Sequence, residues 1–293
     1  MKVEAECAAC ILSRGAAETL EATANPALRF RSMTDLSRML SKEFRPTAVP
    51  ADLGTKRDRI IKRVTGNGDP YKWSKKISNE RALKILPFTR KLVEEGSMQQ
   101  DRFKIACLCA IVGNIIEFDI PGHRFTFSNL KRLLREARKD LEVDDTSKVY
   151  ELTRSARTVL YLADNAGEIV FDTLLVEQMK NMGLTVIAVV KGGPVINDAL
   201  LEDAEVSGMS KIADKVMTTG VDAVGLALNE VSTEFLDTYN SVDLVFAKGM
   251  GYAETLTEYE LKKPHFLLFR TKCNPVANFF GVARERNVAK LMP

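Results

Sequence analysis

The chain has 293 residues, of which 45% are hydrophobic and 28% charged, as in a globular protein of one large or two ordinary domains. Its formal net charge of +3 is too near balance to indicate a nucleic-acid partner. No stretch approaches the ~18 apolar residues of a membrane helix, and residues 1–6 do not resemble a signal peptide. With five cysteines, an odd number, a secreted disulfide framework is not indicated. We therefore expect a cytoplasmic protein that does not bind a membrane.

The first half of the chain has the apolar spacing of helices from residue 5 to about residue 143. One helical face is formed by Leu108, Ile111, Val112 and Ile115. Pro and Gly interrupt the pattern near residues 26, 46, 68–70 and 121–122, which divides it into about six helices. We predict a helical domain over residues 1–145.

The second half alternates short apolar runs with helical patterns. Five runs are rich in strand formers, at residues 158–163, 184–190, 215–218, 243–247 and 265–269. The helices between them are expected to start near residue 196 and to include a long one from about 223 to 239. This order is typical of βαβ units. The prediction is a Rossmann-like, three-layer α/β/α domain with a mainly parallel sheet over residues 146–293.

Ligands of open parallel sheets bind at the carboxyl ends of the strands, where this sequence places polar loops. Asp164, Asn165 and Asp198 offer the hard oxygen ligands that suit Mg²⁺, Mn²⁺ or a similar cation. Positive charges lie at the same edge of the predicted sheet and could neutralise an oxyanion: Lys191, Lys248, Arg270 and Lys272. Glycines in these loops let backbone N–H groups and helix N-termini approach a phosphate. Together these groups suit phosphoryl transfer.

Each of these residues also has a purely structural interpretation, since Asp-Asn and Asn-Asp are common in turns and helix caps. The chain has no Walker motif and no G-x-G-x-x-G after its first strand, so the fingerprints of nucleotide and dinucleotide sites are absent from the sequence. Cys7 and Cys10 form a C-x-x-C pair that could bind metal, be redox active or be structural. Cys107 and Cys109 lie in an apolar helical pattern and are expected in the core.

A series of segments, in this order, resembles the damage-control phosphatase family, formerly domain of unknown function 89, and in particular its C-x-x-C-bearing microbial subfamily. The segments are Cys7-Ala-Ala-Cys10, Gly66-Asn67-x-Asp69-Pro70-Tyr71, Gly113-Asn114, Asp164-Asn165-Ala166-Gly167-Glu168, Pro194-x-x-Asn197-Asp198, Lys248-Gly249-x-Gly251 and Lys272-Cys273. The resemblance implies a phosphatase that uses Mn²⁺, Ni²⁺, Co²⁺ or Mg²⁺ and acts on sugar phosphates or on damaged nucleotides and cofactor metabolites. It places the metal ligands on Asp164, Asn165 and Asp198, the substrate-side asparagine on Asn114 and the phosphate-side lysines on Lys248 and Lys272.

From this we expect Asp164, Asn165 and Glu168 to be catalytic, with Glu168 supporting the site or acting as a general base. Asn114, Lys191, Lys248 and Lys272 are expected to bind a small phosphorylated metabolite. The sequence departs from the family at Tyr252-Ala253, where Asn-Tyr is usual. Other interpretations stay open at this stage: a non-catalytic nucleotide- or cofactor-binding protein, an S-adenosylmethionine-dependent methyltransferase, or a redox or zinc protein centred on Cys7 and Cys10.

Overall fold

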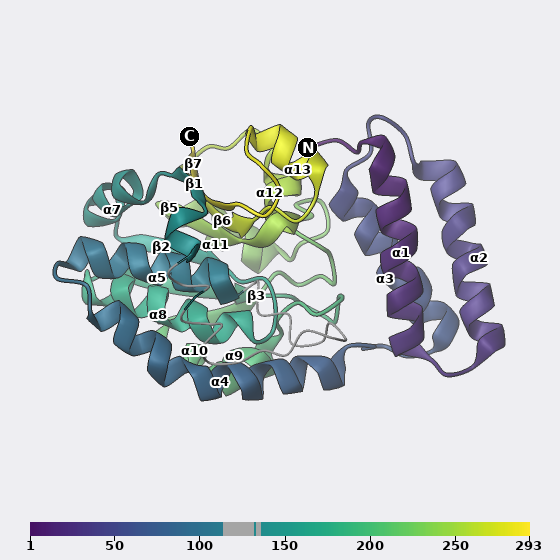
Figure 1. The fold of residues 1–293 in the computed structure, drawn as a ribbon, viewed down its shortest axis with the longest axis horizontal. Helices are drawn as coiled ribbons and strands as arrows, with labels where there is room; N and C mark the ends of the chain where they lie inside the picture. The colour runs from purple at the N-terminus through teal and green to yellow at the C-terminus, as the bar shows by residue number, and fades with distance from the viewer. Residues whose placement is uncertain (114–131, 133–135) are drawn as a thin grey trace.

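The computed structural model describes residues 1–113, 132 and 136–293. Three antiparallel helices form an N-terminal bundle that stands at one end of the molecule (Figure 1), namely α1 (Ala5–Ala22), α2 (Pro26–Glu43) and α3 (Pro50–Thr65). The side chain of Asn25 caps α2 by accepting hydrogen bonds from the backbone of Ala27 and Leu28, and Pro26 follows at the first helical position. A Cβ on Gly15 would lie 2.3 Å from Leu36 Cδ2, so glycine permits the close contact of α1 with α2.

Two further helices connect this bundle to the rest of the chain. α4 (Lys72–Glu94) and α5 (Gln99–Gly113) pack on α8 (Glu168–Asn181). Their contact is apolar and includes Ile85 of α4, Val112 of α5 and Phe171 of α8. In the part of the chain that the structure describes, no helix is long and apolar enough to cross a membrane.

A seven-stranded sheet lies at the centre of the α/β part, in the order β1-β7-β6-β5-β2-β3-β4. The five neighbouring strands β6, β5, β2, β3 and β4 are parallel, whereas β7 is antiparallel to β6 and parallel to β1. The strands are β1 (Leu141–Asp144), β2 (Thr158–Leu162), β3 (Thr185–Val190), β4 (Lys215–Thr218), β5 (Leu244–Lys248), β6 (His265–Arg270) and β7 (Asn287–Met292).

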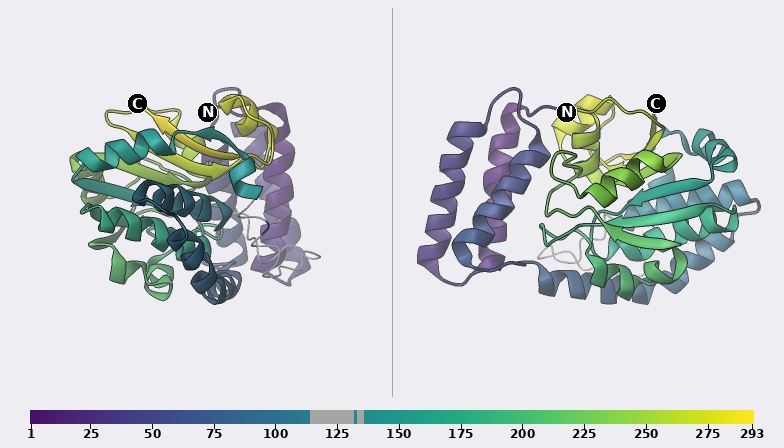
Figure 2. Two further views of the ribbon diagram at one scale, coloured as in Figure 1. Left: turned by 60° about the vertical axis from the view of Figure 1, so that its left-hand side comes forward. Right: turned by 180° about the vertical axis from the view of Figure 1, so that it is seen from behind.

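Helices cover both faces of the sheet (Figure 2). Tyr161 of β2 points to one face, where it joins a core with α5 and α8, while Leu160 and Leu162 point to the other. Among the described residues, further helices are α7 (Thr146–Ser155), α9 (Leu201–Ser207) and α10 (Met209–Ile212) on the first side, and α11 (Thr233–Ser241), α12 (Gly249–Leu256) and α13 (Asn274–Phe280) on the second. The predicted three-layer α/β/α architecture and the five predicted strands are confirmed.

Some local predictions were wrong. The expected helical run does not extend to residue 143, because β1 begins at Leu141 and pairs with β7. The expected helix from 223 starts only at Thr233, because Gly225 has a left-handed φ of 66° and Ser232 caps α11 by accepting a hydrogen bond from Phe235 N. The helix expected near residue 196 begins at Leu201 instead.

His265 is expected to make the free energy of unfolding depend on pH. Its ring lies fully buried between Tyr239 OH, 2.7 Å from Nε2, and the Lys263 carbonyl, 2.8 Å from Nδ1, and burial lowers its pKa to about 4. An unfolded histidine binds a proton below pH ~6.5, so between pH 6.5 and 4 the unfolded state carries more protons than the folded one. We expect this residue to lower the free energy of unfolding by about 2 kcal/mol between pH 7 and pH 5.

Denaturant unfolding at both pH values measures this effect. His265→Gln, which cannot titrate in this range, serves as the comparison. The prediction is that the variant lacks this pH-dependent loss; an equal loss in both proteins would contradict it.

Candidate active site

A cleft of about 630 Å³ lies between the N-terminal bundle, the start of α4 and the carboxyl edge of the sheet. From the sheet side it is lined by Asp164, Asn165 and Asp198, and by Lys272 after β6. From the helical side it is lined by residues of α1, α3 and α4. The predicted metal ligands and one predicted phosphate-side lysine therefore share one cavity with the helical part of the chain.

The loops after β2 and β3 are joined by backbone hydrogen bonds. Asn165 and Asp198 form an isolated antiparallel bridge, and the N–H of Ala199 donates to the carbonyl of Asp164 at 2.7 Å. The N–H of Ala166 donates to the Asn197 carbonyl at 2.9 Å. Although 33 positions separate Asp164 from Asn197, these bonds fix the two loops in one register, and this brings the three predicted metal ligands together.

The side chain of Asn165 connects the two carboxylates that flank it. Its Nδ2 donates to Asp164 Oδ2 at 2.8 Å and to Glu168 Oε2 at 2.9 Å. Both bonds use the amide nitrogen, which leaves the carbonyl oxygen as the atom of Asn165 that could bind a metal. Helix α4 anchors the same loop, because Asn79 Oδ1 accepts the N–H of Gly167 at 2.7 Å.

The electrostatics of this loop favour a bound cation. Burial, together with the negative charges of Glu168 and Asp198, raises the pKa of Asp164 well above its usual value. Burial raises the pKa of Asp198 to about 6, although Lys191 opposes this. Asp198 Oδ2 is buried without a hydrogen bond to any described residue, and Lys191 Nζ lies 3.5 Å away.

A buried carboxylate oxygen that lacks a hydrogen bond from the described residues, beside a second carboxylate and an amide oxygen, suits a hard divalent cation. The set contains only two carboxylates. Consistently, the described residues hold no group of three or more His, Cys, Asp or Glu side chains arranged to bind a metal. A cation here would therefore need water or substrate oxygen to complete its coordination.

The two other predicted lysines lie beneath the cleft rather than in its wall. Lys248 is fully buried: its Nζ donates to the Ala110 carbonyl at 2.9 Å, pairs with Glu168 and lies 3.1 Å from Asp172 Oδ1. Burial alone would lower the pKa of Lys248, but the carboxylates of Asp172 and Glu168 raise it.

Lys191 is also buried and donates to the Gly225 carbonyl at 2.6 Å. Its Nζ lies 4.4 Å from the ring centroid of Tyr252, the residue that departs from the family pattern. Asn114 lies outside the described residues. The substrate-binding roles of Asn114, Lys191 and Lys248 remain predictions. In the structure, Lys248 supports Glu168 and Lys191 supports Asp198.

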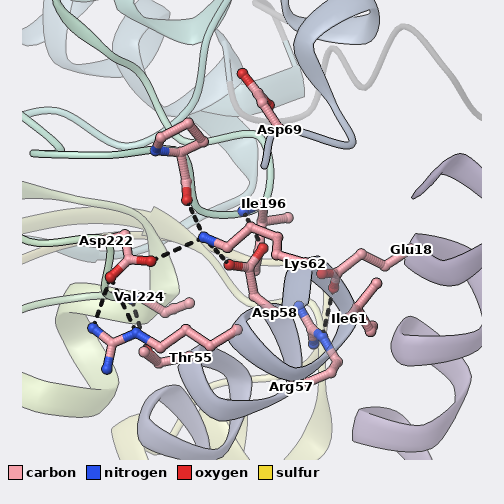
Figure 3. Close-up of polar contacts among 12 residues, drawn as sticks. Glu18, Thr55, Arg57, Asp58, Ile61, Lys62, Asp69, Ile196, Asp222 and Val224 are labelled. Carbon is pink, nitrogen blue, oxygen red and sulfur yellow. Dashed lines mark hydrogen bonds and ion pairs between the residues drawn. The ribbon is translucent and has the colours of Figure 1, made fainter. Parts of the chain in front are cut away.

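The helical side of the cleft contributes basic residues that the sequence did not indicate. Arg14, Arg57 and Lys75 line it. Arg57 Nε donates to Glu18 Oε2 at 2.8 Å, in a buried pair between α3 and α1 (Figure 3), and Lys75 pairs with Asp69 at 2.9 Å. From the sequence, only the family resemblance pointed to this wall of the cleft, through the Cys7-x-x-Cys10 pair of α1, the Gly66–Tyr71 segment before α4 and Asn114.

Three of the five cysteines also line the cleft: Cys7, Cys10 and Cys273. All five are free thiols. Burial raises the pKa of Cys7 and of Cys273, so both are held as thiols. Cys107 and Cys109 lie in the core beside α8, as predicted. Nothing in the described geometry gives the C-x-x-C pair a metal or redox role.

The fold has three layers, with helices on both faces of a mostly parallel sheet. Carboxylates lie at the strand ends, and helices form the opposite wall of the cleft. The protein is therefore of the α/β class with a site at the strand ends. The chain belongs to the damage-control phosphatase family, because the family model described as the damage-control phosphatase ARMT1-like domain matches residues 3–288. The resemblance found in the sequence is thereby confirmed.

Individual relatives agree with this assignment. An uncharacterized protein of Methanocaldococcus jannaschii is 38% identical over 98% of this chain and 95% of its own. A protein of Archaeoglobus fulgidus named damage-control phosphatase is 36% identical over 100% of both chains. The crystal structure of a DUF89 family protein from Pyrococcus horikoshii matches with a TM-score of 0.88 at 33% identity, over 99% of this chain and 98% of that one.

Proposed function

We propose that this protein is a divalent-metal-dependent phosphatase that hydrolyses small phosphate esters, such as sugar phosphates or damaged nucleotide and cofactor metabolites, in the cytoplasm. The observation that carries the proposal is the convergence of Asp164, Asn165 and Asp198 in one cleft with the cations Lys272 and Arg14. Names of relatives support the phosphatase activity. Five free thiols fit a reducing compartment.

Each group has a role that its position supports. A metal held by Asp164, Asn165 and Asp198 would supply Lewis acidity and an activated water. Glu168 holds the Asn165 amide, and Lys248 neutralises Glu168 from below. Lys272, at the cleft wall, can neutralise phosphate oxygens. The bundle and α4 form the other side of the cleft.

The proposal is tested with protein stripped of metal. Phosphate release from p-nitrophenyl phosphate and from a panel of sugar and nucleotide phosphates is measured with Mg²⁺, Mn²⁺, Co²⁺ or Ni²⁺ added back. We expect release with at least one of these metals and only background release in chelator. Stabilisation by nucleotides with no phosphate release under any metal would instead favour the non-catalytic binding protein.

Gly249 is expected to be essential for the geometry of Asp164. Its φ is 81°, and a Cβ there would lie 2.0 Å from Asp164 Oδ2. Gly249→Ala must therefore displace the carboxylate as well as strain the backbone, and a displacement of about 1 Å in a catalytic group can cost on the order of 100-fold in rate. We expect phosphate release to fall by about that factor.

Gly183→Ala is the matched control, since Gly183 has a φ of 84° but no atom within 4 Å of the position that an alanine Cβ would take. It carries the same backbone cost, about 1–2 kcal/mol, without the clash. Comparable activity losses in the two variants, measured at equal folded fraction, would contradict the role assigned to Gly249.

A further inference from the structure

The loop that carries Asp198 contains a strained turn. The N–H of Asp198 donates to the carbonyl of Val195 at 3.1 Å, which closes a four-residue turn, and Ile196 occupies its second position with a φ of 46°. A positive φ at this position favours glycine or asparagine, and for a β-branched residue it costs on the order of 1–3 kcal/mol. Such a conformation persists only where neighbouring contacts enforce it.

Helix α3 supplies those contacts (Figure 3). The carboxylate of Asp58 accepts the N–H of Ile196 at 3.0 Å, and Asp58 is fully buried. Lys62, one helical turn further on, pairs with Asp58 at 2.7 Å and donates to the Pro194 carbonyl at 2.5 Å. Two neighbouring side chains of one helix therefore hold both ends of the segment that precedes Asp198.

The same helix also holds the loop after β4. Lys62 donates to Asp222 at 2.9 Å, Arg59 donates to Asp222 at 2.8 Å, and Thr55 Oγ1 accepts the N–H of Val224 at 2.9 Å. The contacts of Arg59 and Thr55 connect α3 to the α/β part without touching the turn at Ile196, whereas Lys62 reaches both loops. Removing a contact of Arg59 or Thr55 therefore tests the docking of α3 separately from the placement of Asp198.

We infer that Asp58, supported by Lys62, is a positioning residue for the active site: it locks the strained turn at Ile196 and so places Asp198 beside Asp164 and Asn165. The effect on metal binding rests on the proposed function, whereas the role of Asp58 in holding the turn is independent of that function. Asp58 reaches the site through the backbone of Ile196 and through Lys62, so it acts on the metal ligands by way of the loop.

Three variants separate this role from a general loss of stability. Asp58→Ala removes the acceptor for Ile196 N–H, Asp58→Asn keeps an oxygen acceptor there, and Arg59→Ala removes an ion pair of the same helix that does not reach the turn. Lys62→Met, at a partly exposed position, provides a milder variant should Asp58→Ala fail to fold. Hydrogen–deuterium exchange of the peptide covering residues 194–199 and calorimetric titration with Mn²⁺ are the two readouts.

We expect Asp58→Ala to exchange faster over residues 194–199 and to bind Mn²⁺ about tenfold more weakly, the effect of one buried hydrogen bond. Phosphate release should recover at saturating Mn²⁺. Asp58→Asn should restore most of both readouts, Lys62→Met should change both in the direction of Asp58→Ala, and Arg59→Ala should match the wild type.

Unchanged exchange in folded Asp58→Ala, or an equal effect of Arg59→Ala, would overturn the inference. If wild-type protein binds none of Mg²⁺, Mn²⁺, Co²⁺ and Ni²⁺ and releases no phosphate with any of them, the proposed function fails instead. Exchange over residues 194–199 then still decides whether Asp58 locks the turn.

Discussion

Asp164→Ala protein is expected to fold normally and to release phosphate at least about 10³-fold more slowly than the wild type under every metal. Asp164 lies at the cleft, two residues after the end of β2, and is held by the Asn165 side chain at 2.8 Å. If the metal is bound there, its loss removes several kcal/mol of transition-state stabilisation, and each 1.36 kcal/mol corresponds to a factor of ten. The fold should survive, because removing Asp164 also relieves repulsion among three neighbouring carboxylates.

Two further variants complete the test. Asp237→Ala removes an exposed carboxylate of α11 and should behave as the wild type. Asp164→Asn keeps the shape of the side chain but lowers the charge of the site, so we expect weaker Mn²⁺ binding and an intermediate rate. Calorimetric Mn²⁺ titration and phosphate release are measured on all three. A fully active Asp164→Ala protein would overturn both the metal site and the mechanism.

The sequence predicted most of the fold because parallel strands in the middle of a sheet are apolar on both faces. β2 and β5 are buried almost throughout, and their continuous apolar runs could be located to within a residue. The two strands that were missed, β1 and β7, lack such runs. β1 alternates half-buried and exposed residues over four positions, and β7 is only partly buried after its third residue.

The site could be predicted as far as it depends on strand ends. Asp164, Asn165 and Asp198 follow strands whose order brings their loops together, so position alone selected them. The sequence could not predict which side chains at the strand ends are buried. Lys248 ends β5 at the same edge, but whether its side chain enters the cleft or turns beneath it depends on the carboxylates that α8 presents.

Asp58 was missed for a different reason. It lies in a charged stretch, Lys56-Arg57-Asp58-Arg59, that is typical of a solvent-exposed helix face. The structure buries Arg57 and Asp58 because α3 packs between α1 and the loops of the α/β part. The partner of Asp58 is 138 positions away in the chain, a distance at which no local pattern gives a signal.

Lys248→Met is expected to produce the largest loss of stability among single substitutions at this site. The variant would leave Glu168 and Asp172 buried without their common counter-ion, and breaking a buried ion pair on one side typically costs about 3–5 kcal/mol. Burial already raises the pKa of Asp172 to about 7 while Lys248 opposes that rise. Without the lysine, Asp172 should bind a proton at neutral pH, and this limits the loss of stability. Glu168 would still lack its counter-ion.

Denaturant unfolding of three variants tests this account. Lys180→Met is the matched control, because Lys180 pairs with Asp214 at 2.6 Å on the surface and should contribute less than about 1 kcal/mol. Adding Asp172→Asn to Lys248→Met removes one of the two uncompensated charges and should recover part of the lost stability. If the Lys248→Met and Lys180→Met proteins lose similar stability, Lys248 is not the counter-ion of this buried cluster. Its assignment as a phosphate-binding residue would then regain support.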